Sequence, residues 1–295
     1  MRILLTGKNG QVGWELERTL APLGEVIALG RDGMDLADAD SVCRVIREVR
    51  PKLIVNAGAY TAVDKAESDP ELAMKINGVA PGVMAEEAKK LNAALVHYST
   101  DYVFDGIKTE RYKEEDAPNP VNVYGRTKLA GERAIQVVDL PHLILRTSWV
   151  YGLRGKNFLL TIQRLAKERD EIRIVEDQIG TPTWSRMIAE TTAHVLTKCC
   201  ASSIGSLSFS SGVSGLYNLT ASGATSWYGF AQAIIASFRS KPIKNPRLTP
   251  ISSAEYPLPA KRPANSCLCG EKLARCFGVT VPDWKEGLRL CLDIR

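Results

Sequence analysis

Short apolar runs alternate with segments of helical periodicity through the first half of the chain. Each run is too short for a helix and fits a buried strand. The runs cover residues 3–5, 26–29, 53–59, 94–99 and 143–151. Between two of them, apolar residues at positions 42, 45, 46 and 49 predict a helix with one face on a sheet, ended by Pro51. Strands separated by helices predict an α/β fold with a doubly wound parallel sheet of the Rossmann type.

The second half has a different pattern, with helical segments, longer loops and fewer strands. The helical segments are predicted at 158–169, 184–198 and 226–239. Residues 198–215 are rich in Ser and Gly, which indicates a flexible surface loop. We therefore expect residues 1–150 to form a main domain, to which parts of the later chain return. Residues 151–295 should form mainly a smaller C-terminal α/β lobe.

Composition narrows the classes of partner. The chain has 295 residues and a formal charge of +5, without a long basic run. That balance suits an anionic small molecule, so we expect no nucleic acid polymer as partner. The seven cysteines lack C-x-x-C spacing, which favours reduced thiols. The first apolar run is too brief for a signal peptide, and no run is long enough to span a membrane. We expect a cytoplasmic protein with no membrane partner.

A glycine-rich turn follows the first predicted strand. The stretch TGKNGQVG places Gly7, Gly10 and Gly13 between a strand and a helix that begins near Gln11. Such a turn brings a pyrophosphate close to backbone amides at the N-terminus of the helix. We predict a dinucleotide site that includes Gln11 and Val12, although G-x-x-G-x-x-G is a variant spacing.

The end of the second strand bears on the choice of cofactor. An acidic residue that binds the adenosine ribose is usual there, whereas this chain has Gly30 and Arg31. Arg31 could pair with a 2′-phosphate, which favours NADPH over NADH. Asp32 could still accept a ribose hydroxyl, so both cofactors stay open. Asp35 and Leu36 are candidates for contacting the adenine, and Asp35 for capping the next helix.

Tyr124 and Lys128 lie four positions apart in VYGRTKLAGE. If residues 123–136 are helical, the two side chains share a face about 6 Å apart. A tyrosine is a poor acid or base at neutral pH, and a neighbouring positive charge lowers its pKa. Thr100 ends the fourth apolar run, in STDYVFDG, where open α/β sheets bind ligands.

The glycine turn, the strand-end threonine and the helical Tyr-Lys pair occur in this order. Together with NAGAYTAVDKAE, LRTSWVYG, DQIGTPT and RPANS, they resemble the extended short-chain dehydrogenase/reductase family over the whole chain. The resemblance implies reduction, with NADPH or NADH, of the C4 keto group of a dTDP-linked 4-keto-6-deoxyhexose. It implies that Tyr124 is the general acid, that Lys128 lowers the pKa of Tyr124 and binds the nicotinamide ribose, and that Thr100 orients the carbonyl.

Further residues gain expected roles from the same resemblance. The cofactor trough should include Ala59, Tyr60, Thr61 and Tyr98. Asp101 should contact the sugar, Trp149 should wall the hexose pocket, and Lys261 and Arg262 are candidate partners of the diphosphate. Trp149 could instead be a half-buried core residue, and the two basic residues a solvated turn.

The sequence leaves several functions open. Sugar dehydratases of the same superfamily carry a glutamate directly after the aspartate of the Ser-Thr-Asp segment, where this chain has Tyr102, which disfavours elimination. The chain could also be a nucleotide-sugar epimerase, or a non-catalytic subunit resembling the regulatory β subunit of methionine adenosyltransferase. Some family members are linked to Mg²⁺ at a dimer contact, for which Glu15 is a candidate, but the sequence itself predicts no metal site. A homodimer is left open.

Overall fold

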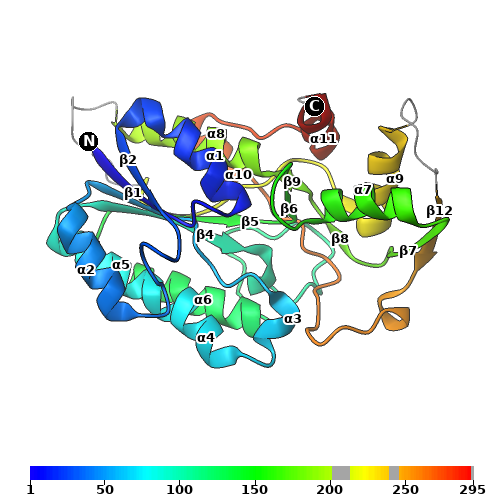
Figure 1. The fold of residues 1–295 in the computed structure, drawn as a ribbon, viewed down its shortest axis with the longest axis horizontal. Coiled ribbons are helices and arrows are strands. Elements are labelled where there is room, and N and C mark those ends of the chain that lie inside the picture. Colours follow the sequence, from blue (N-terminus) through cyan, green and yellow to red (C-terminus); the bar gives the residue numbers. More distant parts are fainter. Residues whose placement is uncertain (201–212, 239–245, 294–295) are drawn as a thin grey trace.

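A six-stranded parallel sheet forms the centre of the computed structural model, which describes residues 1–200, 213–238 and 246–293 (Figure 1). Its strands stand in the order β10-β5-β4-β3-β1-β2. They are β1 (Arg2–Thr6), β2 (Glu25–Leu29), β3 (Leu53–Asn56), β4 (Ala94–Thr100), β5 (His142–Thr147) and β10 (Gly215–Asn218). The strand order reverses between β1 and β3, and this is the position where open α/β sheets bind ligands. The predicted doubly wound α/β class is confirmed.

Helices cover both faces of the sheet (Figure 1). Alternate residues of one strand point to opposite faces, so Ile3 and Leu5 join one core cluster and Leu4 joins the other. The first face packs against α1 (Gln11–Thr19) and α8 (Ser185–Cys200), and the second against α2 (Ala39–Val49), α5 (Ala80–Lys90) and α6 (Val123–Gln136). Because both faces of the sheet are buried, its strands need no alternation of apolar and polar residues, which explains the short apolar runs of the sequence.

The second half builds a lobe at one end of the sheet and also returns to it (Figure 1). The lobe contains α7 (Phe158–Glu168), α9 (Trp227–Ala236) and three strand pairs. These pairs are β6 (Val150–Tyr151) with β9 (Thr183–Trp184), β7 (Glu171–Val175) with β12 (Arg247–Ile251), and β8 (Ile179–Gly180) with β11 (Thr225–Ser226). The expectation of fewer strands in this half was therefore wrong, in part because four of its strands have only two residues and leave no periodic signal.

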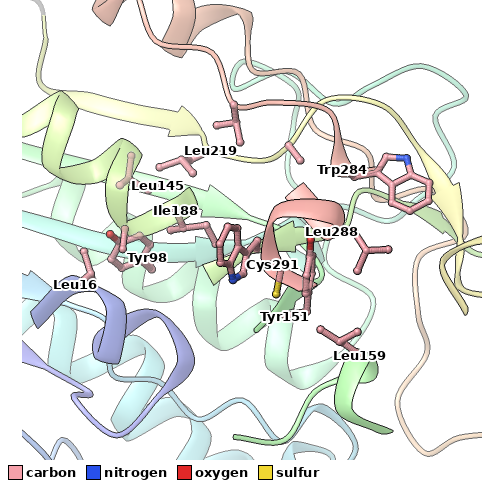
Figure 2. Packing of buried hydrophobic residues seen from close by; sticks show 14 of the residues in the cluster. Leu16, Tyr98, Leu145, Tyr151, Leu159, Ile188, Leu219, Trp284, Leu288 and Cys291 are labelled. Carbon is pink, nitrogen blue, oxygen red and sulfur yellow. The ribbon is translucent and has the colours of Figure 1, made fainter. Parts of the chain in front are cut away.

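One apolar cluster joins the sheet to the lobe. Figure 2 shows its side chains from α1, the sheet, α8, α7 and the C-terminal helix; labelled examples are Leu16, Tyr98, Ile188, Leu159 and Leu288. The C-terminal helices are α10 (Glu271–Phe277) and α11 (Trp284–Asp293). The remaining short helices are η1 (Ala21–Leu23), α3 (Val63–Ala66), α4 (Pro70–Met74), η2 (Lys75–Val79), η3 (Asp101–Val103) and η4 (Ser253–Glu255).

Several predicted boundaries need correction. The run 143–151 is not one strand, because Trp149 has φ 45° and separates β5 from β6. The run 53–59 ends as a strand at Asn56, where the chain turns into the ligand-binding edge. In the predicted loop 198–215, α8 continues to Cys200 and β10 begins at Gly215, while residues 201–212 lie outside the described residues. The helical segments 158–169, 184–198 and 226–239 correspond to α7, α8 and α9.

No helix in the described ranges is both long and apolar enough to cross a membrane.

Candidate active site

A cavity of about 930 Å³ opens at the carboxyl ends of β1, β3 and β4. It brings together segments from both halves of the chain. The predicted site residues that line it are Gly7, Gly10, Gln11, Val12, Arg31, Asp35, Leu36, Ala59, Thr61, Tyr98, Thr100, Asp101, Tyr124, Lys128, Trp149 and Arg262. Gly13 and Tyr60 do not line it. Tyr60 instead binds Asn77 through its backbone and Asp69 through its hydroxyl.

The glycine turn forms a cradle that larger side chains would fill. Gly7 has φ 74°, and a Cβ there would lie 2.7 Å from the backbone of Ala57 and Gly58. A Cβ at Gly13 would lie 2.0 Å from the Gly7 carbonyl oxygen, which explains a packing role outside the cavity. The helix α1 follows without a side-chain cap, so its first amides are available to an anion. The cradle fits the pyrophosphate of a dinucleotide.

The residues after β2 lie at the far end of this cradle. The exposed guanidinium of Arg31 stands 3.6 Å from a carboxylate oxygen of Asp35. Asp35 also accepts a hydrogen bond from the Ala37 amide, whereas the cap of α2 is Asp38, which accepts from the Asp40 amide. The capping role considered for Asp35 was therefore wrong.

Tyr124 and Lys128 occupy successive turns of α6, as the spacing predicts. The helix begins at the cap residue Asn122, whose side chain accepts from the Gly125 amide at 2.7 Å. Burial raises the pKa of Tyr124 to about 12, although the nearby Thr100 hydroxyl acts to lower it. The phenol is consequently protonated at neutral pH, which suits a proton donor.

Lys128 is held by strand β4. Its side chain is only 1% exposed, and Nζ donates to the Tyr98 carbonyl oxygen at 2.6 Å. Nζ also lies 3.2 Å from Nε2 of His97. Burial lowers the pKa of Lys128 to about 8, and Glu132 opposes that shift.

Asp101 lies beside this pair, at the floor of the cavity. Its Oδ1 accepts from the Thr100 hydroxyl at 2.9 Å, and its Oδ2 is buried with no hydrogen-bond partner. Burial raises the pKa of Asp101 to about 7, against the effect of the hydrogen bond from Thr100. The ring of Tyr102, in the position of the dehydratase glutamate, meets the Tyr124 ring edge to face at 5.6 Å.

The opposite wall comes from the second half of the chain. Trp149 donates from Nε1 to the Ser266 hydroxyl at 3.1 Å and stacks on Trp227 with ring centroids 3.5 Å apart. Arg262 makes two hydrogen bonds to the Asp64 carboxylate, at 2.8 and 3.0 Å. Its guanidinium therefore already has an anionic partner. Lys261, the other basic candidate, does not line the cavity.

Sequence analysis missed several polar residues of the site. Asn56 and His97 are each 1% exposed and lie beneath the cradle, bonded to each other at 3.0 Å. Asn157 donates to the Gln11 side chain at 2.8 Å and ties the lobe to the glycine turn. A polar residue inside an apolar run, as in LIVN or ALVHYST, was the available signal.

Metal binding has no support in the geometry of the described ranges. Glu15 lies on α1 and does not line the cavity, and burial raises its pKa. No group of three or more His, Cys, Asp and Glu side chains in the described part of the chain is placed to hold a metal ion. A Mg²⁺ ion at a dimer contact would draw on a second chain as well, so it stays a hypothesis.

Comparison with known proteins decides the family. The model of the RmlD substrate binding domain matches residues 1–295. The chain belongs to the RmlD family. Among its relatives, the dTDP-4-dehydrorhamnose reductase of Burkholderia thailandensis is 50% identical over 99% of this chain and 98% of that protein. The family assignment agrees with the resemblance read from the motifs.

Solved structures of RmlD relatives share the whole fold. A dTDP-4-dehydrorhamnose reductase from Clostridium acetobutylicum superimposes with a TM-score of 0.90 and 37% identity, over 100% of this chain and 99% of that one. A reductase of the same name from Bacillus anthracis, solved in complex with NADP, gives a TM-score of 0.87 and 34% identity, over 100% of this chain and 99% of that one. The RmlD family thus includes members that bind the phosphorylated dinucleotide.

Proposed function

We propose that this chain reduces the C4 keto group of dTDP-4-dehydro-6-deoxy-L-mannose to give dTDP-L-rhamnose, using NADPH. This is the last step of dTDP-rhamnose synthesis, and the reductase names of the RmlD relatives support it. The observation that carries the proposal is that the buried Tyr124 lies beside Thr100 and Lys128 in the cavity that the glycine cradle opens into.

The cofactor would lie along the cradle. Gly7, Gly10, Gln11 and Val12 would bind the pyrophosphate, while Arg31, Asp35 and Leu36 would hold the adenosine end. Ala59, Thr61 and Tyr98 line the same trough, and Tyr60 and Gly13 would support it from behind. When bound, NADPH supplies the hydride that reduces the keto carbon. The positive charge of Arg31 favours the 2′-phosphate of NADPH.

The proton comes from this chain's own side chains. Thr100 would hold the C4 oxygen of the sugar in line with the Tyr124 hydroxyl, which gives up its proton to that oxygen. A phenol whose pKa is raised to about 12 starts the reaction protonated. Lys128, when charged, would stabilise the phenolate that forms and bind the nicotinamide ribose.

Substrate binding would depend on the opposite wall. Trp149 offers an apolar ring to the hexose, and Asp101 an unpartnered carboxyl oxygen to its hydroxyls. Arg262 would bind the diphosphate after leaving Asp64. The reductase names of the relatives favour this function over an epimerase or a regulatory subunit. We further propose a cytoplasmic enzyme; a homodimer stays a prediction.

The direct test follows the loss of NADPH and NADH absorbance with the dTDP-4-keto-6-deoxyhexose as substrate. Stoichiometric oxidation, faster with NADPH, is expected. An epimerase would turn over without added reductant, and a regulatory subunit would consume neither cofactor, so either result would reject the proposal.

A further inference from the structure

Four buried polar side chains form a row beneath the glycine cradle. Thr6 of β1 bonds Asn56 of β3 at 2.7 Å, Asn56 bonds His97 of β4 at 3.0 Å, and His97 lies 3.2 Å from Nζ of Lys128. None of the four is more than 2% exposed. The row crosses three neighbouring strands and ends at Lys128 of α6. It therefore links the glycine cradle to the lysine that lies one helical turn from Tyr124.

The orientation of the Asn56 amide is fixed at the cradle end. The Gly58 backbone amide, which can only donate, lies 3.2 Å from Asn56 Oδ1 and 3.1 Å from the Thr6 hydroxyl oxygen. The Thr6 hydroxyl therefore uses its own hydrogen on Asn56 Oδ1. Because Oδ1 is the acceptor, the Asn56 group that faces His97 is the NH₂ donor.

This direction determines the tautomer of His97. Nδ1 must accept from Asn56, so the single proton of a neutral imidazole sits on Nε2. Burial lowers the pKa of His97 well below its usual value, so the ring is neutral at neutral pH. Nε2–H then points at Lys128 Nζ.

An ammonium group has three donors and no lone pair, so it cannot accept that hydrogen. A neutral amine can accept it and still donate to the Tyr98 carbonyl oxygen at 2.6 Å. We propose that Thr6, Asn56 and His97 form a directional hydrogen-bond relay that presents a donor to Lys128 and thereby favours the neutral amine form of the lysine over the ammonium. His97 is thus a positioning residue for Lys128.

Protonation of Lys128 has a structural consequence in this arrangement. One proton is taken up from solvent at Nζ, and the imidazole proton moves from Nε2 to Nδ1, where it opposes the Asn56 NH₂. The bond between Asn56 and His97 is then lost. Since Thr6 and Gly58 line the cavity, the charge state of Lys128 is coupled to the floor of the cradle.

Other titratable groups around Lys128 do not supply this control. Glu132, one turn further along α6, favours the charged lysine, but its carboxylate is ion-paired with Arg146 of β5 at 2.6 Å. Tyr124 lies one turn earlier on α6, and Asp101 of η3 acts on the pKa of Tyr124. His97 is the titratable side chain that contacts Nζ directly from β4.

Nitrogen NMR of the wild-type protein tests the relay without any assay. The chain has three histidines, so the ring signals can be assigned with His97→Asn and His142→Asn. We expect His97 as the Nε2–H tautomer at pH 9, and the ring proton should move to Nδ1 as Lys128 is protonated below about pH 8. An Nδ1–H tautomer at pH 9, or a tautomer that does not change with pH, would overturn the proposal.

Asn56→Asp reverses the direction of the hydrogen bond to His97 Nδ1, because a carboxylate oxygen, which accepts, replaces the NH₂ group, which donates. We expect the His97 proton to lie on Nδ1 at pH 9 in this variant, which leaves Nε2 as an acceptor for an ammonium. An unchanged tautomer would contradict the relay. If Asn56→Asp does not fold, the wild-type tautomer alone decides.

A kinetic arm rests on the proposed function. The alkaline fall of kcat/KM should move up by about one pH unit or more in Asn56→Asp. The added charge alone also favours a charged lysine, so the double variant Asn56→Asp with His97→Asn should retain only part of the shift. His142→Asn, a half-buried histidine on β5 outside the cavity, should leave the profile unchanged. An equal shift in single and double variants would reject the relay, whereas absent turnover in the wild type would reject the function and leave the NMR result standing.

Discussion

The two walls of the cavity are built differently. On the sheet side, Asn56, His97 and Lys128 are each 1% exposed and are bonded within β3, β4 and α6. On the lobe side, the half-buried Arg262 bonds to Asp64 of α3, and the half-buried Trp149 bonds to Ser266. The sheet wall is therefore fixed before a ligand arrives, whereas groups of the lobe wall must change partners to bind one.

This difference matches the two ligands. A cofactor common to many enzymes can be bound by a rigid cradle, in which the positions of backbone amides are set by strands. The nucleotide sugar must be enclosed. On the lobe side, Arg262 would bind it by exchanging its ion pair with Asp64 for a contact with the diphosphate. Variants of the two walls should consequently differ in which kinetic constant they change.

The largest effect is expected at the sheet wall. Tyr124→Phe removes the hydroxyl that would donate the proton, so kcat should fall by about 10²- to 10⁴-fold. NADPH affinity, measured by cofactor fluorescence, should stay nearly unchanged because the ring remains. The matched control is Tyr228→Phe on α9, outside the cavity, which should behave as wild type. Loss of both turnover and cofactor binding would mean that Tyr124 has a structural role.

The next effect concerns Asp101, and it depends on pH. Burial raises the pKa of this carboxyl to about 7 in the folded protein, from the usual 3.8. Between these two pH values the carboxyl of Asp101 is protonated in the folded state and ionised in the unfolded chain. The free energy of unfolding of the wild type therefore falls as the pH rises through this range. Asp101→Asn should therefore raise the free energy of unfolding at pH 8 by on the order of 2 kcal/mol, with little change at pH 4.

Thermal unfolding of Asp101→Asn at several pH values checks this. The gain should develop between about pH 4 and pH 7. An equal change in Tm at all pH values would show that Asp101 is not held near neutrality in the fold. If Asp101 contacts the sugar, the same variant should be more stable at pH 8 but less active. The two measurements then separate the effect of Asp101 on stability from its role in substrate binding.

The lobe wall offers a pair of opposite effects. Arg262→Ala removes the proposed partner of the diphosphate and should raise the KM for the nucleotide sugar by about tenfold, with the KM for NADPH unchanged. Asp64→Ala leaves Arg262 without its internal partner and should lower the substrate KM by about threefold, a smaller effect because the pair is partly exposed. Equal changes for both substrates, or a raised KM in both variants, would contradict this exchange of partners.

The sequence predicted the residues of the sheet wall better than the contacts of the lobe wall. The glycine turn spans eight residues and the Tyr124–Lys128 pair one helical turn, so local spacing was enough. Arg262 and Asp64 are 198 positions apart, and their contact depends on how the lobe packs against α3. The break at Trp149 was also missed, since LILRTSWVY is rich in strand-forming residues on both sides of Trp149 and the φ of 45° leaves no local signal.

The smallest expected effect is at the outer end of the cradle. Arg31 is exposed, with 76% of its side chain accessible, so its interaction with a 2′-phosphate is screened by solvent. Arg31→Ala should lower the ratio of kcat/KM for NADPH over that for NADH by about two- to fivefold, and high salt should reduce the wild-type ratio in the same direction. Arg44→Ala, an exposed arginine on α2 outside the cavity, is the matched control. A ratio that strongly favours NADH in the wild type would remove Arg31 from cofactor choice and transfer that role to Asp32.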